Sequence, residues 1–259
     1  MIISSDSNPR IKSLRKLLEK SRERKKTNSF VVEGIQENKF ALRANFELLE
    51  SYVCPDIYKG EIDNYITIPK LNISKAVYAK LAYRETTEGI ICVYKESVES
   101  KLPLKVNKQA TYIILEAIEK PGNLGAILRS CDALSCDGII LIDVLVDIYN
   151  PNVIRSSVGT IFSNNIYKST FNTTIEWLKN QNIHLYTTHL HLSSKSLSGI
   201  SFRDKSAILF GTENSGVSNQ WVEKSDDIIK IPMHGMVESL NVSNSVAICL
   251  FESLRQKKG

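Results

Sequence analysis

Long apolar runs are missing from this 259-residue chain. No stretch reaches the roughly 18 apolar residues that a membrane-spanning helix needs, and the longest, over residues 138–146, is interrupted by aspartate. The first residues, MIISSDSNPRIKSL, lack the apolar core of a secretion signal. With 42% hydrophobic and 24% charged residues, the chain can still bury a full core. The sequence therefore predicts a cytoplasmic globular protein.

Cysteine is scarce and scattered. The five cysteines form no CxxC pair, and no histidine lies at ligand spacing from them. We therefore expect buried thiols, with neither a disulfide framework nor a metal site. The residues concerned are Cys54, Cys92, Cys131, Cys136 and Cys249.

Several familiar signatures are also missing. The chain has no GxGxxG, so the usual dinucleotide-binding or open Rossmann methyltransferase fold lacks its loop. It has no GxxxxGK[ST] phosphate loop, no GxSxG nucleophile elbow and no HExxH zinc motif. Any catalytic site must therefore use another arrangement.

Positive charge is concentrated in one segment. Residues 10–26 hold nine Lys or Arg against two Glu, so a net charge of +5 leaves −2 for the other 242 residues. The apolar positions Ile11, Leu14 and Leu18 predict one helix over residues 8–26 that starts at Asn8-Pro9. Such a basic helix favours contact with a polyanion, although a solvated helix face has the same pattern. The RNA-binding candidates are Arg10, Lys12, Arg15, Lys16 and Arg22.

The apolar pattern predicts two α/β domains joined by a linker. Short alternating helices and strands fill residues 1–95, whereas residues 96–110 lose apolar periodicity and hold Pro103. From residue 111, continuous apolar strands alternate with helices, which predicts a parallel sheet covered on both faces. The expected strands are 112–117, 138–142, 184–188, 207–210 and 228–231, and the expected helices are 124–135, 151–157, 172–181, 218–224 and 242–256.

Three of the expected strands run into polar, glycine-bearing loops. The loops read EKPGNLG from Glu119, GTENSG from Gly211 and PMHGMVESLN from Pro232. Ligands of parallel sheets bind beyond the carboxyl ends of the strands, so these loops are the place for a site. Each loop taken alone is also explained by helix capping or a simple turn. Three together favour a binding site.

These loops resemble the three signature motifs of the SpoU (TrmH) family of RNA ribose 2′-O-methyltransferases. The matching segments are PGNLGAILRSCDAL (121–134), LFGTENSGV (209–217) and IPMHGMVESLNVSNSVAICLFE (231–252). The resemblance covers 111–259 and implies an S-adenosylmethionine-dependent domain with a trefoil-knotted α/β fold, a mostly parallel sheet and homodimers. Segments SDSNPRIKSLRKL (5–17) and FVVEG (30–34) resemble the ribosomal-protein-like α/β domain that often precedes it and binds RNA.

The resemblance also implies residue roles. Matched to the family motifs, the catalytic candidates are Asn123, Arg129, Glu213, Ser239 and Asn241. The methyl donor would lie against Thr188, His189, Phe210, Gly211, Ile231, Met233 and Leu240. Asn244 and Ser245 depart from the small apolar residues usual in the family, and His234 occupies a position that the family does not use.

Two questions stay open at the level of sequence. An arginine does not readily release its proton, so Arg129 is expected to position and stabilise rather than to act as a free base. Asn123 and Arg129 are six residues apart and share a helix face only if Asn123 precedes the first turn.

Ribosomal RNA is favoured as substrate. The alternatives are transfer RNA as substrate, methylation of a base nitrogen, and a non-catalytic RNA-binding protein.

Overall fold

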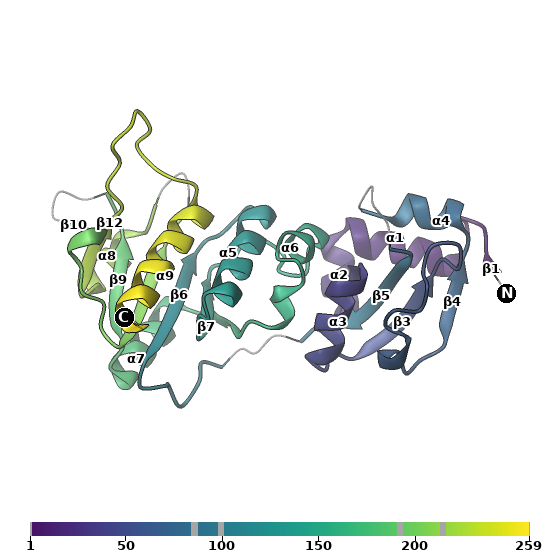
Figure 1. The fold of residues 1–259 in the computed structure, drawn as a ribbon, viewed down its shortest axis with the longest axis horizontal. Helices are drawn as coiled ribbons and strands as arrows, with labels where there is room; N and C mark the ends of the chain where they lie inside the picture. The colour runs from purple at the N-terminus through teal and green to yellow at the C-terminus, as the bar shows by residue number, and fades with distance from the viewer. Residues whose placement is uncertain (1, 84–87, 98–100, 191–193, 213–215, 259) are drawn as a thin grey trace. The chain divides into compact units, whose positions relative to one another are not determined.

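The computed structural model describes residues 2–83, 88–97, 101–190, 194–212 and 216–258. The chain divides into two compact units, each of α/β type (Figure 1). The first unit comprises Met1–Ser97 and Asp147–Ser163, and the second comprises Val98–Val146 and Asn164–Gly259. The sequence predicts a first domain at 1–95, a linker at 96–110 and a second domain at 111–259. These ranges stay a prediction, and they do not place residues 147–163 in the first unit.

The first unit is built on a mixed five-stranded sheet with the order β1-β4-β3-β5-β2. Strand β5 runs antiparallel to both of its neighbours, whereas β1, β4 and β3 are mutually parallel. The strands are β1 (Ile2–Ile3), β2 (Ser29–Glu33), β3 (Leu48–Val53), β4 (Lys70–Ile73) and β5 (Ile90–Lys95). The helices are α1 (Pro9–Glu19), α2 (Ser21–Thr27), α3 (Ile35–Arg43), α4 (Lys75–Leu81) and α6 (Pro151–Ser156), with short 3-10 turns at Asp63–Tyr65 and Thr160–Phe162.

The basic segment forms two helices rather than the single predicted one. Asn8 caps α1 as expected, its side chain accepting a hydrogen bond from the Arg10 amide. Lys20 then adopts an extended backbone conformation, which ends α1 and starts α2. The turn carries Arg24 into the interior, where its side chain is only 3% exposed. The prediction missed the break because local periodicity does not reveal a buried guanidinium.

The sequence also predicts a strand at Tyr65–Ile68, and this prediction is wrong. Tyr65 ends a 3-10 turn, and the strand begins instead at Lys70. Pro69 lies between them and has no amide proton to donate to a ladder. Pairing with β3 and β1 therefore starts only after the proline.

Residues 147–163 pack with the first unit although they lie between two strands of the second. Arg24 Nε donates to Asp147 Oδ2 at 2.7 Å, and its guanidinium also donates to the Leu17 and Leu18 carbonyls. The Tyr149 ring stacks on Phe30 with centroids 4.1 Å apart and planes at 7°. This segment therefore supplies both an ion-pair partner and aromatic core to the first unit.

The second unit is built on a seven-stranded sheet in which every neighbouring pair is parallel, with the order β10-β12-β9-β11-β6-β7-β8. Its strands are β6 (Ala110–Glu116), β7 (Gly138–Ile142), β8 (Ile166–Ser169), β9 (His184–Thr188), β10 (Lys195–Ser196), β11 (Lys205–Phe210) and β12 (Asp227–Lys230). Its helices are α5 (Pro121–Ala133), α7 (Phe171–Gln181), α8 (Asn219–Lys224) and α9 (Val242–Lys258), with a 3-10 turn at Leu197–Gly199. The predicted fold class is thus confirmed in its α/β composition and parallel second sheet, whereas the knotted path stays a prediction.

The central strands of this sheet are apolar on both faces. Strands β6, β7 and β11 are almost wholly buried, and Tyr112, Trp177 and Trp221 belong to one core cluster with their apolar residues. No helix within the described residues combines the length and apolar character needed to span a bilayer. The same residues contain no cluster of His, Cys, Asp or Glu that could hold a metal ion.

Candidate functional site at the carboxyl edge of the parallel sheet

The three polar loops leave the same edge of the second sheet. They follow β6, β11 and β12, and these strands lie within four consecutive positions, β12-β9-β11-β6. Neighbouring strands are about 4.8 Å apart, so the three loop origins span roughly 14 Å. The parallel topology thus brings together three segments that are far apart in the sequence.

The first loop is shorter than predicted because α5 begins at Pro121 and not at Leu124. Proline at the first position of a helix is favourable, since the amide it lacks has no partner there. Asn123 therefore lies in the first helical turn. Its Oδ1 accepts a hydrogen bond of 3.1 Å from Asn241 Nδ2, which joins the first loop to the third. This contact links two predicted site residues that are 118 positions apart.

Arg129 does not share a helix face with Asn123. Both lie in α5, and six positions rotate the side chain to about 120° away from Asn123. The Arg129 side chain is exposed and forms no hydrogen bond or ion pair with any described residue. The condition for a shared face, that Asn123 precede the first turn, is not met. Arg129 is therefore available to a ligand that extends beyond the Asn123–Asn241 pair.

The second loop is closed by a short backbone bridge. The Thr212 amide donates to Gly216 O at 3.0 Å, and the Gly216 amide donates to Thr212 O at 3.1 Å. A Cβ at Gly211 would stand 2.0 Å from Gly216 O, so only glycine fits this close approach. Gly216 itself has a φ of +67°, which glycine adopts without strain. Glu213 lies outside the described residues.

Glu116 is a residue of the site that the sequence analysis missed. It ends β6 and is buried, and its carboxylate accepts from the Ser218 amide at 2.8 Å and from Ser218 Oγ at 2.6 Å. It thereby joins the origin of the first loop to the end of the second. The available signal was a carboxylate that terminates the otherwise apolar strand TYIILE.

The third loop runs from Ile231 to Asn241 and projects from the sheet as the long yellow-green trace between β12 and α9 (Figure 1). Within the described part of the chain, residues 231–240 form no hydrogen bond with other residues. Ser239 and His234 are exposed, whereas Ile231, Met233 and Leu240 are half-buried. The peptide groups of this loop are therefore open to a ligand.

Asn241 ends this loop and caps α9. Its Oδ1 accepts from the Ser243 amide at 2.9 Å and from Ser243 Oγ at 2.6 Å, while its carbonyl accepts from the Ser245 amide at 3.0 Å. The two departures from the family pattern leave the core intact, because Asn244 is exposed and Ser245 is half-buried beside a fully buried Val246.

The remaining donor-site candidates belong to the scaffold. Thr188 Oγ1 donates to Leu209 O at 2.9 Å, which ties β9 to β11. The His189 amide donates to Ile229 O at 3.1 Å, and the Phe210 side chain is buried. Thr188 and His189 are half-buried at the end of β9, and their role in donor binding stays a prediction.

The predicted RNA-binding residues lie in the first unit, on α1 and α2. Arg10, Lys12, Lys16 and Arg22 are exposed. Arg15 is half-buried, and its guanidinium lies 3.7 Å from Asp6 Oδ1. Four of the five candidates thus present their charge to solvent. They do not belong to the unit that carries the three loops.

An all-parallel sheet with three polar loops at its carboxyl edge has the architecture of an α/β enzyme that binds its ligand beyond the strand ends. The SpoU rRNA Methylase family matches residues 110–251, more than half of the chain, and the chain belongs to this family. The MRM3-like substrate binding domain matches residues 8–92. Membership confirms the expectation of an S-adenosylmethionine-dependent RNA methyltransferase.

Relatives and solved structures agree over the whole chain. The 23S rRNA (guanosine(2553)-2′-O)-methyltransferase RlmP of Bacillus subtilis is 27% identical, covering 96% of this chain and 97% of its own. A structure described as an RNA 2′-O ribose methyltransferase is 34% identical, with a TM-score of 0.87 and complete coverage of both chains. An AdoMet-bound rRNA methyltransferase from Sinorhizobium meliloti has the same fold, with a TM-score of 0.89 at 23% identity over 98% of this chain and 97% of its own.

Proposed function

We propose that this chain transfers a methyl group from S-adenosylmethionine to a ribose 2′-hydroxyl, with ribosomal RNA as its substrate. The observation that carries the proposal is the hydrogen bond between Asn241 and Asn123. It connects two loops from opposite ends of the domain at the sheet edge where ligands bind. The family match over residues 110–251 and the similarity to the rRNA enzyme RlmP over nearly the whole chain support it.

The loops fit the proposed donor. S-adenosylmethionine supplies a methyl group on a sulfonium together with polar adenine and amino-acid groups, which need hydrogen-bonding partners. The peptide groups of residues 231–240 have no hydrogen-bonding partner among the described residues. In the neighbouring loop, Gly211 has no side chain that would cover its backbone. We assign donor binding to Gly211, Ile231, Met233 and Leu240, with Thr188, His189 and Phe210 beneath them.

The chain's main task in this reaction is positioning, because the sulfonium is already a good leaving group. Asn123 and Asn241 are proposed to orient the ribose, with Ser239 and Glu213 completing the site as the family motifs imply. Arg129, exposed and without a partner among the described residues, is suited to a bidentate contact with the neighbouring phosphate. The exposed Arg10, Lys12, Lys16 and Arg22, with Arg15, are proposed to hold the RNA at the first unit.

We further propose that the enzyme is a homodimer through its second unit. Residues Leu197, Pro232, Ala247, Ile248 and Phe251 line an apolar groove of about 560 Å³ beside α9. Phe251 is 57% and Ile248 39% exposed, and such a large apolar pair on a monomer surface favours association. A second copy is the expected occupant because α9, which carries Ile248 and Phe251, is capped by the site residue Asn241 and so connects the groove to the site.

The dimer is tested by sedimentation velocity of Phe251→Asp against Leu104→Asp. Leu104 is 92% exposed in the second unit and lies outside the groove, so its variant is a matched control for surface charge. Phe251→Asp is expected to sediment as a monomer, whereas Leu104→Asp should sediment like wild type. A monomeric wild type, or a dimer that survives Phe251→Asp, would contradict the proposal.

The activity is tested with purified protein, tritiated S-adenosylmethionine and protein-free ribosomal or transfer RNA. Digestion of the product should release labelled 2′-O-methyl nucleosides from ribosomal RNA. Asn123→Ala should lower kcat by about 100-fold, the usual effect of a misplaced reacting group. The control Asn172→Ala removes an exposed amide on α7 that forms no side-chain contact among the described residues.

Three results would contradict the proposal. A labelled base would indicate methylation of a base nitrogen, and transfer to tRNA alone would refute the assignment to ribosomal RNA. Failure to bind S-adenosylmethionine in the presence of RNA would indicate a non-catalytic RNA-binding protein. Wild-type activity of Asn123→Ala would show that the Asn241–Asn123 hydrogen bond does not contribute to the reaction.

A further inference from the structure

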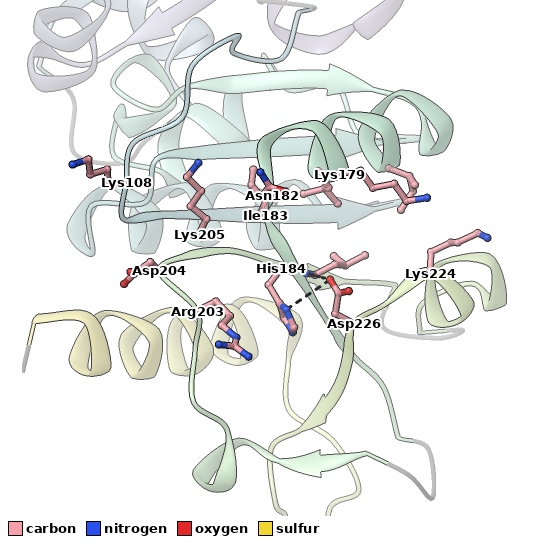
Figure 2. Close-up of a pocket in the computed structure, with 13 residues that line it drawn as sticks. Lys108, Lys179, Asn182, Ile183, His184, Arg203, Asp204, Lys205, Lys224 and Asp226 are labelled. Carbon is pink, nitrogen blue, oxygen red and sulfur yellow. Dashed lines mark hydrogen bonds and ion pairs between the residues drawn. The ribbon is translucent and has the colours of Figure 1, made fainter.

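A basic groove lies at the opposite edge of the parallel sheet from the three loops. It has a volume of about 830 Å³ and follows the amino ends of β9 and β11 and the residues just before β12. Five cationic side chains line it, and Figure 2 shows them spread along its length, from Lys108 at one end to Lys224 at the other. They are Lys108, Lys179, Arg203, Lys205 and Lys224.

These cations are not neutralised by the protein. Lys108, Lys179, Arg203 and Lys224 have no side-chain hydrogen bond or ion pair with any described residue, and Lys205 Nζ donates only to a backbone carbonyl at 3.2 Å. Lys108, Lys179, Arg203 and Lys224 are exposed, so their charges are open to an anion in solution.

Two carboxylates line the groove, and both accept hydrogen bonds from amide groups. Asp226 Oδ2 accepts from the Leu185 amide at 2.8 Å, and Asp204 Oδ1 accepts from Gln109 Nε2 at 3.3 Å. His184 Nδ1 lies 3.9 Å from Asp226 Oδ2, and His184 Nε2 lies 2.8 Å from Oδ2 of Asp227, which does not line the groove. Five cations therefore face two carboxylates in this groove. The excess of positive charge is local, because the 242 residues outside 10–26 carry a net charge of −2.

The floor of the groove strengthens its positive potential. Leu178, Ile183 and Leu185 are buried apolar residues that line it from below. A low-dielectric wall under like charges focuses the field into the groove and attracts anions. Spread along an elongated groove, these charges match a chain of phosphates better than a single anion.

We propose that this groove binds the phosphate backbone of the substrate RNA, away from the reacting ribose. The inference rests on the proposed function, which supplies RNA as the ligand. Lys205 begins β11 and Phe210 ends it beside the second loop, so the two edges are about 17 Å apart at 3.3 Å per residue. A single RNA strand covers this distance with several nucleotides. The groove would therefore hold RNA flanking the target and contribute affinity rather than chemistry.

The test compares two double variants of the full chain. Lys179→Gln/Lys224→Gln removes two charges from the groove, whereas Lys101→Gln/Lys105→Gln removes two exposed charges that do not line it. All four lysines belong to the second unit and have no partner among the described residues. Binding of a fluorescein-labelled, mixed-sequence 40-nucleotide RNA is followed by anisotropy between 0.1 and 1 M salt, and circular dichroism confirms folding.

The expected effect follows from counterion release. Each phosphate contact with single-stranded RNA contributes about 0.7 to the slope of log K against log salt. Loss of two contacts should lower the slope by about 1.4. If the groove variant and wild type bind RNA equally at 1 M salt, the variant should then bind about 25-fold more weakly than wild type at 0.1 M salt. The control double should keep the wild-type slope and affinity.

Three outcomes would overturn the inference. They are wild-type RNA binding by the groove double variant, an equal loss of RNA affinity in both double variants, and a groove that binds a small polyphosphate but not RNA. The last is recognised by calorimetry with inorganic tripolyphosphate, if its binding depends on Lys179 and Lys224 while RNA affinity does not. Methyl transfer is measured on the same samples. If the proposed function fails, wild type itself transfers no methyl group; if only the groove inference fails, wild type transfers it and the two doubles bind RNA alike.

Discussion

Replacing Gly211 by alanine tests whether the bridged second loop forms part of the methyl-donor site. The backbone of Gly211 lies outside the left-handed region, so alanine meets no conformational penalty there, only a lack of space. Its Cβ would stand 2.0 Å from Gly216 O and 2.2 Å from Gly216 C, whereas ordinary contacts begin near 3.4 Å. Both contacted atoms belong to the backbone, so the loop itself must move by more than 1 Å.

Such a shift breaks the bridge between Thr212 and Gly216. Its two hydrogen bonds, 3.0 and 3.1 Å long, would exceed bonding distance. At about 0.5 to 1.5 kcal/mol each, their loss lowers the free energy of unfolding by about 1 to 3 kcal/mol. The reduced entropy of the unfolded alanine chain offsets about 0.4 to 1 kcal/mol of this.

The assay combines urea denaturation with calorimetric titration of S-adenosylmethionine. Gly211→Ala should unfold at lower urea and bind the donor at least 10-fold more weakly, because the loop no longer presents its backbone. Gly199→Ala is the matched control, since a Cβ there meets no atom within 4 Å and Gly199 lies outside the three loops. If the two variants behave alike in both measurements, the assigned role of the bridged loop is refuted.

Three further predictions concern the helix cap, a lysine and the first unit. Asn241→Ala removes the cap of α9 and the contact with Asn123, so it should lower the free energy of unfolding by about 1 to 2 kcal/mol in urea denaturation. Asn123→Ala removes only the contact and should lower it less, and equal losses in the two variants would contradict this. Burial lowers the pKa of Lys257 to about 8 from the ordinary 10.5, so the unfolded chain holds this proton more tightly. Wild type should therefore gain stability relative to Lys257→Met as pH rises from 8 to 10.5, and a falling difference would refute the assignment. Tyr149→Ala removes the ring stacked on Phe30 and should cost about 3 to 5 kcal/mol, with amide hydrogen exchange in β2 speeding up first; unchanged exchange there would contradict it.

The parallel sheet could be predicted because its central strands are buried on both faces. Segments such as TYIILE (111–116) and GIILI (138–142) are continuous apolar runs, and that pattern occurs where helices cover both sides of a sheet. Strand β8 and the two-residue β10 escaped prediction because they lie at the sheet's edges. Their residues, IYKS and KS, are polar enough to read as loop.

The candidate site could be predicted to the level of loops but not of contacts. Glycines and polar residues after three strands marked the loops, since strand ends are visible in the pattern. That Asn241 reaches Asn123, or that Glu116 holds Ser218, depends on the strand order, which periodicity does not contain. The separation of Arg129 from Asn123 depends in turn on where α5 begins, and boundaries are the least reliable part of any pattern.

The buried Arg24 shows why contiguous sequence ranges describe the first unit poorly. Its guanidinium is satisfied by Asp147, which is 123 residues away, and by two carbonyls of α1. Without residues 147–163, this charge would stay buried without its counterion, at a cost of about 3 to 5 kcal/mol. Phe30 would also lose the rings of Tyr149 and Phe162. Since small domains are stable by only about 5 to 15 kcal/mol, residues 1–97 alone lack part of what folds them. The first unit is therefore completed by a segment that the chain supplies only after it has begun the parallel sheet.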